Sequence, residues 1–221
     1  MKNKKKQAKN IIMALEKAYP DAICSLDYGK PYELLISVRL AAQCTDARVN
    51  IVTQKLFGKY PTLESFAFAA VADITEIVRP CGLGNSKARD IVAMCSRLMD
   101  EYAGVVPDTI EELLKLPGVG RKTANLIVGD VYKKPAVVCD THCIRITNLM
   151  GLSDSKNPAI VEKQLREVLP PNKSNDFCHR LVLHGRAVCK ARNPQCASCA
   201  AKEYCDYNKN LYSITKVDDH V

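Results

Sequence analysis

The chain has 221 residues, 47% hydrophobic and 25% charged, which is typical of a folded globular protein and argues against disorder. Its 32 Lys and Arg residues against 24 Asp and Glu give a net charge of +8, which favours a polyanionic partner without proving one. No apolar run could cross a bilayer and no signal-peptide core is present, so we expect a cytoplasmic protein.

Apolar residues recur at helical spacing along most of the chain, with caps, prolines and glycines as boundaries. The expected helices cover residues 31–43, 47–57, a short stretch after Thr62, 74–78, 86–102, 110–116, 121–132, 141–150 and 175–188. The expected N-caps are Asp46, Thr62, Asp73, Asp108 or Thr109, and Asp140. The apolar trio Val137, Val138 and Cys139 is an isolated strand signal without a partner. The predicted fold class is therefore all-α.

Eleven cysteines is a high number, and because it is odd and the chain is expected to be cytoplasmic, a secreted disulfide framework fits poorly. Seven of them lie among apolar neighbours and are expected to be buried thiols: Cys24, Cys44, Cys81, Cys95, Cys139, Cys143 and Cys178. The other four, near the C-terminus, are spaced C-x6-C-x2-C-x5-C: Cys189, Cys196, Cys199 and Cys205.

Four thiolates so close in sequence can converge on one metal centre, because short loops close easily. Structural zinc sites usually use two tight Cys or Cys/His pairs, and here only Cys196 and Cys199 form one. The spacing favours a [4Fe–4S] cluster over zinc and leaves both open. Arg186, Lys190 and Arg192 make this loop basic, which suits phosphate contacts and equally a solvated surface.

The segment Leu116–Thr123 (LPGVGRKT) is the sharpest local signal. A helix ends, Pro and two glycines make a tight turn, and a new helix begins. The first N–H groups of that helix and its dipole form an anion site suited to a phosphodiester. A Walker-type nucleotide loop is a poor alternative, because the upstream segment is helical rather than a strand.

Lys122 lies in the first turn of this second helix. The positive helix end and the neighbouring Arg121 both disfavour its protonated form, and burial would add to the effect. An unprotonated amine is a nucleophile. Most lysines are solvated surface charges, and what distinguishes Lys122 is its place directly after an anion-binding turn.

At these residues the sequence resembles the endonuclease III family of helix-hairpin-helix DNA glycosylases. The matching segments appear in the family's order and cover residues 10 to 207: LAAQCTDARVN (40–50), GLGNSKA (82–88), LPGVGRKTAN (116–125), VCDTHCIR (138–145) and LVLHGR (181–186) with the cysteine tail. No single segment is decisive, and together they are highly specific.

The resemblance implies a repair enzyme that removes oxidised pyrimidines from damaged double-stranded DNA and then cuts the strand by β-elimination. Lys122 would attack C1′ of a flipped-out nucleotide and form a Schiff base, with Asp140 beside it. Gln43 and Leu83 would fill the gap in the duplex. Gly118, Val119, Gly120, Arg121 and Thr123 would hold backbone phosphates, and Cys189, Cys196, Cys199 and Cys205 would bind a [4Fe–4S] cluster. His142 and His184 match family positions and are expected to pack or hydrogen-bond.

The resemblance also implies two helical domains flanking a DNA-binding cleft, in a nucleoid-associated monomer. One is a six-helix domain over residues 24–134, the other combines residues 1–23 with 135–213 and the cluster, and 214–221 form a tail. Gly84 and Arg39 depart from residues common in the family, and neither touches the implied chemistry. Rival functions are a mispair-specific glycosylase, a zinc-stapled DNA-binding protein without catalysis, and an electron-transfer protein.

Overall fold

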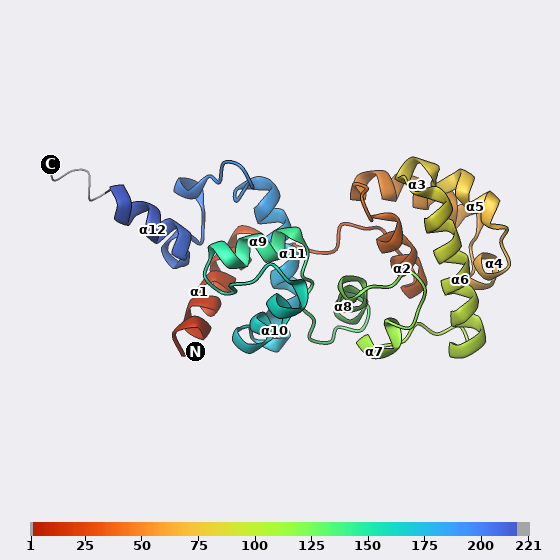
Figure 1. Ribbon diagram of the computed structural model, residues 1–221, viewed down its shortest axis with the longest axis horizontal. Coiled ribbons are helices and arrows are strands. Elements are labelled where there is room, and N and C mark those ends of the chain that lie inside the picture. Colours follow the sequence, from red (N-terminus) through yellow and green to blue (C-terminus); the bar gives the residue numbers. More distant parts are fainter. Residues whose placement is uncertain (1, 216–221) are drawn as a thin grey trace. The chain divides into compact units, whose positions relative to one another are not determined.

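The computed structural model describes residues 2–215, and these residues form helices and connecting loops without any strand (Figure 1). The all-α prediction is therefore confirmed. Residues 24–133 form one compact unit, and residues 1–23 join residues 134–221 in a second unit. No helix among the described residues is long and apolar enough to span a membrane.

The unit of residues 24–133 is organised around one long helix, α6, which packs against α4, α5 and α2. Its helices are α2 (Pro31–Leu40), α3 (Asp46–Lys59), α4 (Leu63–Ala67), α5 (Val71–Val78), α6 (Gly84–Tyr102), α7 (Ile110–Leu113) and α8 (Arg121–Asp130), with a 3₁₀ turn, η1 (Arg79–Cys81). The core between them is apolar and includes Leu35, Leu56, Phe66, Ile91 and Leu98, all fully buried. Burial of these side chains is the main stabilising contribution to this unit.

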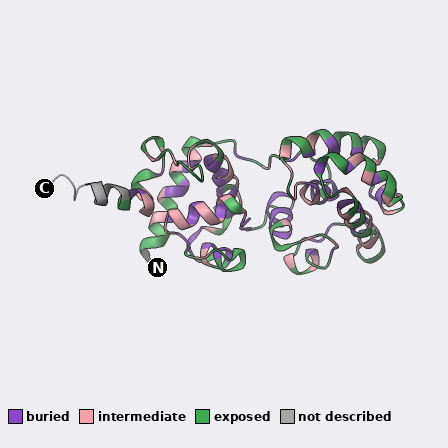
Figure 2. Cartoon of the chain, turned by 45° about the horizontal axis from the view of Figure 1, so that its top comes forward, coloured by how far each residue is buried: buried purple, intermediate pink, exposed green. Residues whose placement is uncertain are grey.

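The other unit is built on α11, which packs against α9 and α1. Its helices are α1 (Lys2–Ala18), α9 (Thr141–Leu149), α10 (Pro158–Val168), α11 (Ser174–Ala187) and α12 (Asp206–Thr215), with the 3₁₀ turns η2 (Pro171–Lys173), η3 (Cys196–Ser198) and η4 (Lys202–Tyr204). The Gln7 amide of α1 donates to the carbonyls of Met150 and Tyr204, so the N-terminal helix holds the chain ends of α9 and η4. In Figure 2 the buried residues lie on the faces that the helices turn toward each other within a unit.

Three of the predicted helix caps are confirmed by their hydrogen bonds. The Thr62 hydroxyl accepts from the Ser65 N–H at 3.1 Å, and the Asp140 carboxylate accepts from the Cys143 N–H at 2.7 Å. Thr109, rather than Asp108, caps α7. Each confirmed cap is a short polar side chain directly before an apolar helical segment.

Two other predicted caps are wrong, because in each case the helix begins earlier. Thr45 caps α3, so Asp46 is its first residue. Ala70 precedes α5, and Asp73 lies within the first turn, where a carboxylate favours the helix dipole without capping.

The helices expected from apolar spacing also omitted α1, α10 and α12, and the weak strand signal at residues 137–139 corresponds to extended chain with no strand partner among the described residues. Cys24 and Cys44 are half-exposed, whereas the other five cysteines expected to be buried are buried. The expected tail at 214–221 lies largely outside the described residues.

Candidate functional site

The turn between α7 and α8 has the tight geometry that its glycines predicted. Gly118 has a φ of +73°, which L side chains rarely adopt, and the Val119 N–H donates back to the Leu116 carbonyl at 3.2 Å. Gly120 is the N-cap of α8 and provides no side-chain acceptor. No side chain therefore caps the N–H groups in the first turn of α8. Uncapped N–H groups at the start of a helix are an arrangement that binds anions.

An ion pair lies directly behind this turn. The Arg39 guanidinium donates to the Asp90 carboxylate, with Nε 2.7 Å and the second nitrogen 2.6 Å from Oδ2. A Cβ added at Gly118 would lie 2.9 Å from the Asp90 Cβ and 3.1 Å from the Arg39 Cδ. Arg39, which the sequence analysis placed outside the chemistry, therefore contacts the hairpin itself.

Lys122 is exposed on the first turn of α8, beside the exposed Arg121 and the half-buried Thr123. The later residues of α8, from Ala124 to Asp130, are buried and anchor this turn in the core. The burial of the Lys122 side chain that would add to its nucleophilicity is therefore not present in the free protein. The amine lies where an external substrate can reach it.

Asp140 begins α9 in the other unit, and its carboxylate caps that helix at the Cys143 N–H. Asp140 is half-exposed, so its carboxylate is not enclosed in a buried hydrogen-bond network. Because Lys122 and Asp140 belong to different units, their expected juxtaposition stays a prediction.

The two residues expected to fill a gap in DNA share an unusual backbone conformation. Gln43 has a φ of +57° and Leu83 a φ of +52°, both in the left-handed region, which non-glycine residues enter rarely and at a cost of about 1–2 kcal/mol. Leu83 is 57% exposed despite being apolar, and Gln43 is also exposed. Strained, exposed side chains on loop tips suit contact with a ligand better than packing in a core.

Lys87, which the sequence analysis did not single out, holds these two loops together. Its side chain is fully buried. Its ammonium donates to the carbonyls of Leu40 and Ala42, at 2.8 and 2.7 Å, and of Cys81 at 2.7 Å. The first two carbonyls precede Gln43 and the third precedes Leu83. The only sequence signal was the place of Lys87 in the family-like segment GLGNSKA.

The four C-terminal cysteines line one hollow with mostly apolar walls, formed by the end of α11, η3, η4 and the loops between them. Burial raises the pKa of Cys196, Cys199 and Cys205, and neighbouring thiols add to it in each case. All four thiols line this one hollow, as the spacing predicted.

Polar groups surround these sulfurs. An Arg145 nitrogen lies 3.7 Å from the Cys189 sulfur and the His184 Nε2 lies 3.5 Å from the Cys199 sulfur. His184 is buried, which lowers its pKa to about 4, and its Nδ1 lies 3.3 Å from the Tyr19 hydroxyl. The expected hydrogen-bonding role of His184 is confirmed. An anionic thiolate centre would be stabilised by these N–H groups.

As a donor set, four thiols around one apolar hollow fit an iron–sulfur cluster, in which each thiolate binds a different iron. Within the described residues, no three Cys, His or carboxylate side chains form a group that could hold a single metal ion. Arg186, Lys190 and Arg192 are exposed on or beside this loop, as expected of side chains that face a large anion or solvent.

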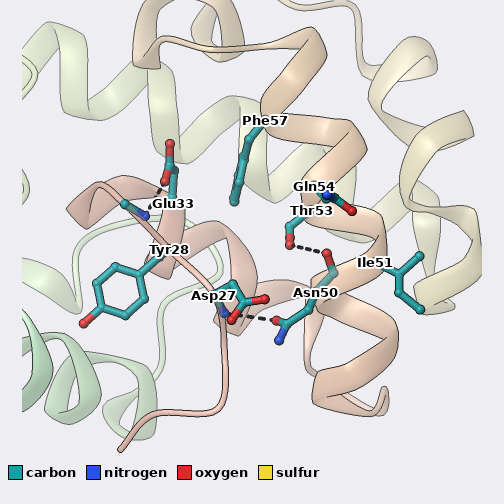
Figure 3. A pocket seen from close by; sticks show the side chains of 9 residues that line it. Asp27, Tyr28, Glu33, Asn50, Ile51, Thr53, Gln54 and Phe57 are labelled. Carbon is teal, nitrogen blue, oxygen red and sulfur yellow. Dashed lines mark hydrogen bonds between the residues drawn. The ribbon is translucent and has the colours of Figure 1, made fainter.

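A further hollow of the unit 24–133 lies between the segment before α2 and the side of α3 (Figure 3). Its polar groups hold the chain in place. Asn50 Oδ1 accepts from the Asp27 N–H at 3.1 Å, and the Glu33 carboxylate accepts from the N–H groups of Gly29 and Lys30. These polar groups form hydrogen bonds that fix the chain before α2, so their role in this hollow is structural.

Comparisons with known proteins agree with this geometry. Residues 36–171 match the family model described as HhH-GPD superfamily base excision DNA repair protein. Endonuclease III of Synechocystis sp. is 40% identical over 93% of this chain and 94% of its own length, and endonuclease III of Escherichia coli K12 is 37% identical over 91% and 95%.

Solved structures give the same result. A trapped endonuclease III–DNA covalent intermediate matches with a TM-score of 0.87 and 40% identity, covering 94% of this chain and 98% of that one. A thermostable thymine-DNA glycosylase matches with a TM-score of 0.81 at 24% identity, and this match supports the fold alone. The chain therefore belongs to the endonuclease III family, within the HhH-GPD superfamily of base excision DNA repair proteins.

Proposed function

We propose that this protein removes oxidised pyrimidines from duplex DNA and cleaves the abasic strand, with Lys122 as the nucleophile and Asp140 as its partner. The protein is a DNA N-glycosylase and abasic-site lyase by family. The observation that carries the residue assignment is the exposed amine of Lys122 on the first turn of α8, directly after a glycine hairpin without a capping side chain.

In the proposed reaction the hairpin N–H groups bind a DNA phosphate, which brings the sugar of an extruded nucleotide to Lys122. The Lys122 nitrogen attacks C1′ while the damaged base leaves with the glycosidic electron pair. Loss of a proton from nitrogen and opening of the sugar give a Schiff base at C1′. Removal of a C2′ proton then expels the 3′ phosphate, and water releases Lys122.

Asp140 has two roles in this proposal. Its carboxylate caps α9, which fixes the side chain at the start of the helix. The same anion helps to orient or deprotonate the Lys122 amine and stabilises positive charge on the sugar. Gln43 and Leu83 occupy the gap that the extruded nucleotide leaves, which fits their exposed positions on left-handed backbone.

We further propose that Cys189, Cys196, Cys199 and Cys205 hold a [4Fe–4S] cluster. The cluster would staple the loop and so present Arg186, Lys190 and Arg192 to the DNA backbone. The all-thiol donor set, its apolar hollow and the nitrogens beside two sulfurs support a thiolate-bound centre, and the wide C-x6-C-x2-C-x5-C spacing favours the cluster over zinc. One chain supplies every proposed group, so we expect a monomer to act on one lesion. We also expect the protein to be associated with the nucleoid.

Borohydride trapping on a duplex that carries one oxidised pyrimidine tests the nucleophile. Borohydride reduces a Schiff base to a stable amine, so wild-type protein should become covalently linked to DNA. Lys122→Gln should form no adduct, although it should still bind the duplex. Lys115→Gln is the matched control, because it removes the same charge from a nearby exposed lysine. Trapping by Lys122→Gln at the wild-type rate would disprove the assignment.

Asp140→Asn separates the two roles of Asp140. Asparagine is as good an N-cap as aspartate, so the stability of α9 should be retained while the charge is lost. We expect trapping at least about 100-fold slower, with DNA affinity little changed. Asp140→Ala should show the same loss of rate and also lose about 1 kcal/mol of stability. Equal rates for wild type and Asp140→Asn would remove the carboxylate from the mechanism.

A further inference from the structure

Gln43 and Leu83 lie on two short loops, and each loop follows the end of a helical segment. Gln43 lies between α2 and α3, and Leu83 lies between η1 and α6. The last carbonyls of a helical segment have no N–H partner within it and need a donor from elsewhere. Leu40 ends α2 and Cys81 ends η1, so both loops begin at such carbonyls.

Lys87 of α6 supplies the donor for both loops. Its ammonium nitrogen lies 2.7 Å from the Ala42 and Cys81 carbonyl oxygens and 2.8 Å from that of the last residue of α2. Its backbone N–H also donates to the Leu83 carbonyl at 3.0 Å. One residue therefore binds the peptide unit directly before Gln43 and the peptide unit directly after Leu83.

The Lys87 nitrogen binds these carbonyls in its charged form. A carbonyl oxygen only accepts hydrogen bonds, so three such contacts need three N–H donors, which an ammonium has and a neutral amine lacks. The side chain is fully buried, and burial of a charge costs free energy that an apolar side chain would not cost. Positions at which a chain departs from the most stable choice are often functional.

The backbone that Lys87 holds is strained in both loops. Gln43 has a φ of +57° and Leu83 a φ of +52°, and such residues keep their conformation only where surrounding contacts enforce it. The Lys87 hydrogen bonds to the Ala42 and Leu83 carbonyls provide this enforcement directly beside each strained residue. Without them, each loop would relax toward ordinary backbone angles and move its exposed side chain.

We propose that Lys87 is a positioning residue for the extrusion of the damaged nucleotide, because it fixes the Gln43 and Leu83 loops in the arrangement that fills one gap in the duplex. This role rests on the proposed function, in which these two side chains enter the DNA. Lys87 is itself fully buried, so it acts through the loops and contacts no reacting atom.

The expected consequence of losing the Lys87 ammonium is a slower extrusion step. Misplacement of positioned groups by about 1 Å can slow a reaction about 100-fold. The hairpin before α8 and the Lys122 amine do not depend on these hydrogen bonds, so phosphate binding and the nucleophile should be retained.

Two DNA duplexes separate a role in extrusion from a role in stability alone. One carries an oxidised pyrimidine opposite its normal partner base, and the other carries the same lesion opposite an abasic-site analogue. In the second duplex the lesion is already unpaired and no base is orphaned, so extrusion needs less help from the loops. The ratio of the borohydride trapping rates on the two duplexes does not change if part of a variant is unfolded.

Lys87→Met removes the ammonium and keeps an unbranched apolar side chain. Trapping on the paired lesion should slow by at least about tenfold, whereas trapping on the lesion opposite the abasic-site analogue should stay within about threefold of wild type. Leu98→Ala is the matched control, because it removes a buried side chain from the far end of α6 and should affect both duplexes to the same extent. Equal slowing on both duplexes by Lys87→Met would overturn the proposal.

Lys87→Arg keeps the test decisive if Lys87→Met does not fold. The guanidinium retains the charge and several donors, but its planar fork cannot place three donors around one nitrogen. This variant should therefore show the same selective slowing on the paired lesion, to a smaller extent than Lys87→Met. Slowing on both duplexes to the same extent, or on neither, would refute the positioning role if this were the only variant that folds.

A protein that already lacks the two inserted side chains tests whether Lys87 acts through them. In Gln43→Ala/Leu83→Ala protein, the further change Lys87→Met should slow trapping on the paired lesion by less than about twofold, because the effects of coupled groups do not add. A loss as large as in the wild-type background would show that Lys87 acts by another route. Failure of wild type to trap on either duplex would instead refute the proposed function itself.

Discussion

The hairpin before α8 and the cysteine loop after α11 position their functional residues by opposite means. In the hairpin, Gly118 at positive φ, the buried length of α8 and an ion pair behind the turn fix the backbone directly. In the cysteine loop, the chain between Cys189 and Cys205 has only two short 3₁₀ turns, and its four thiols surround an apolar hollow. The hairpin is thus formed by the polypeptide itself, whereas we expect the loop to depend on the cluster that its thiols are proposed to bind.

The largest expected effect comes from removing one thiol from the cysteine loop. Cys199→Ser should give a colourless protein, because one ligand of the proposed cluster is lost. Trypsin should then cut at Lys190, Arg192 or Lys202 at least about tenfold faster, since the loop loses its main constraint. The hairpin unit, residues 24–133, should remain resistant.

Cys24→Ser provides the control for that experiment, because it removes a half-exposed thiol from the other unit. This variant should keep the brown colour of an iron–sulfur protein, and its cysteine loop should resist trypsin as that of wild type does. A colourless Cys199→Ser protein whose loop is as resistant as that of wild type would show that the loop, like the hairpin, is fixed by the chain alone.

A smaller effect is expected from glycine substitutions in the hairpin, which test its dependence on backbone geometry. Gly118→Ala should lower the free energy of unfolding by about 2 kcal/mol or more, because alanine disfavours φ of +73° and its Cβ would meet Asp90. Gly120→Ala should cost less than about 1 kcal/mol, because a Cβ there meets nothing within 4 Å. Urea denaturation followed by circular dichroism measures both, and similar losses would contradict the structural explanation.

An effect smaller than that of Gly118→Ala should come from the ion pair behind the hairpin. Arg39→Leu should lower the free energy of unfolding by about 1 kcal/mol, because the Arg39 and Asp90 side chains are 17% and 30% exposed and water screens part of their attraction. A double-mutant cycle with Asp90→Asn should give a coupling energy of about 0.5–1 kcal/mol. A coupling energy near zero would mean that Gly118 alone fixes the turn.

Local sequence patterns predicted the features that depend on neighbouring residues, namely helix caps and turns. Thr62 and Asp140 were recognisable caps because each precedes an apolar helical segment, and the hairpin glycines predicted its turn. The start of α10 carried the same kind of signal, Asn157 followed by Pro158, and could have been found. The caps at Asp46 and Asp73 failed because a residue just upstream began the helix.

Contacts between distant segments were beyond such patterns. Arg39 and Lys87 each appear in the sequence as one cation among 32. Only the packing of α2 against α6 shows that Arg39 meets Asp90 behind the hairpin, and that Lys87 is buried among three carbonyls. The four C-terminal cysteines were readable as one group because their spacing is local.

The buried ammonium of Lys87 has a mechanical consequence. Since one nitrogen binds carbonyls on both sides, a displacement of the Leu83 segment is transmitted through it to the Gln43 segment. We therefore expect the loops that carry Gln43 and Leu83 to move together in the proposed reaction, rather than one after the other.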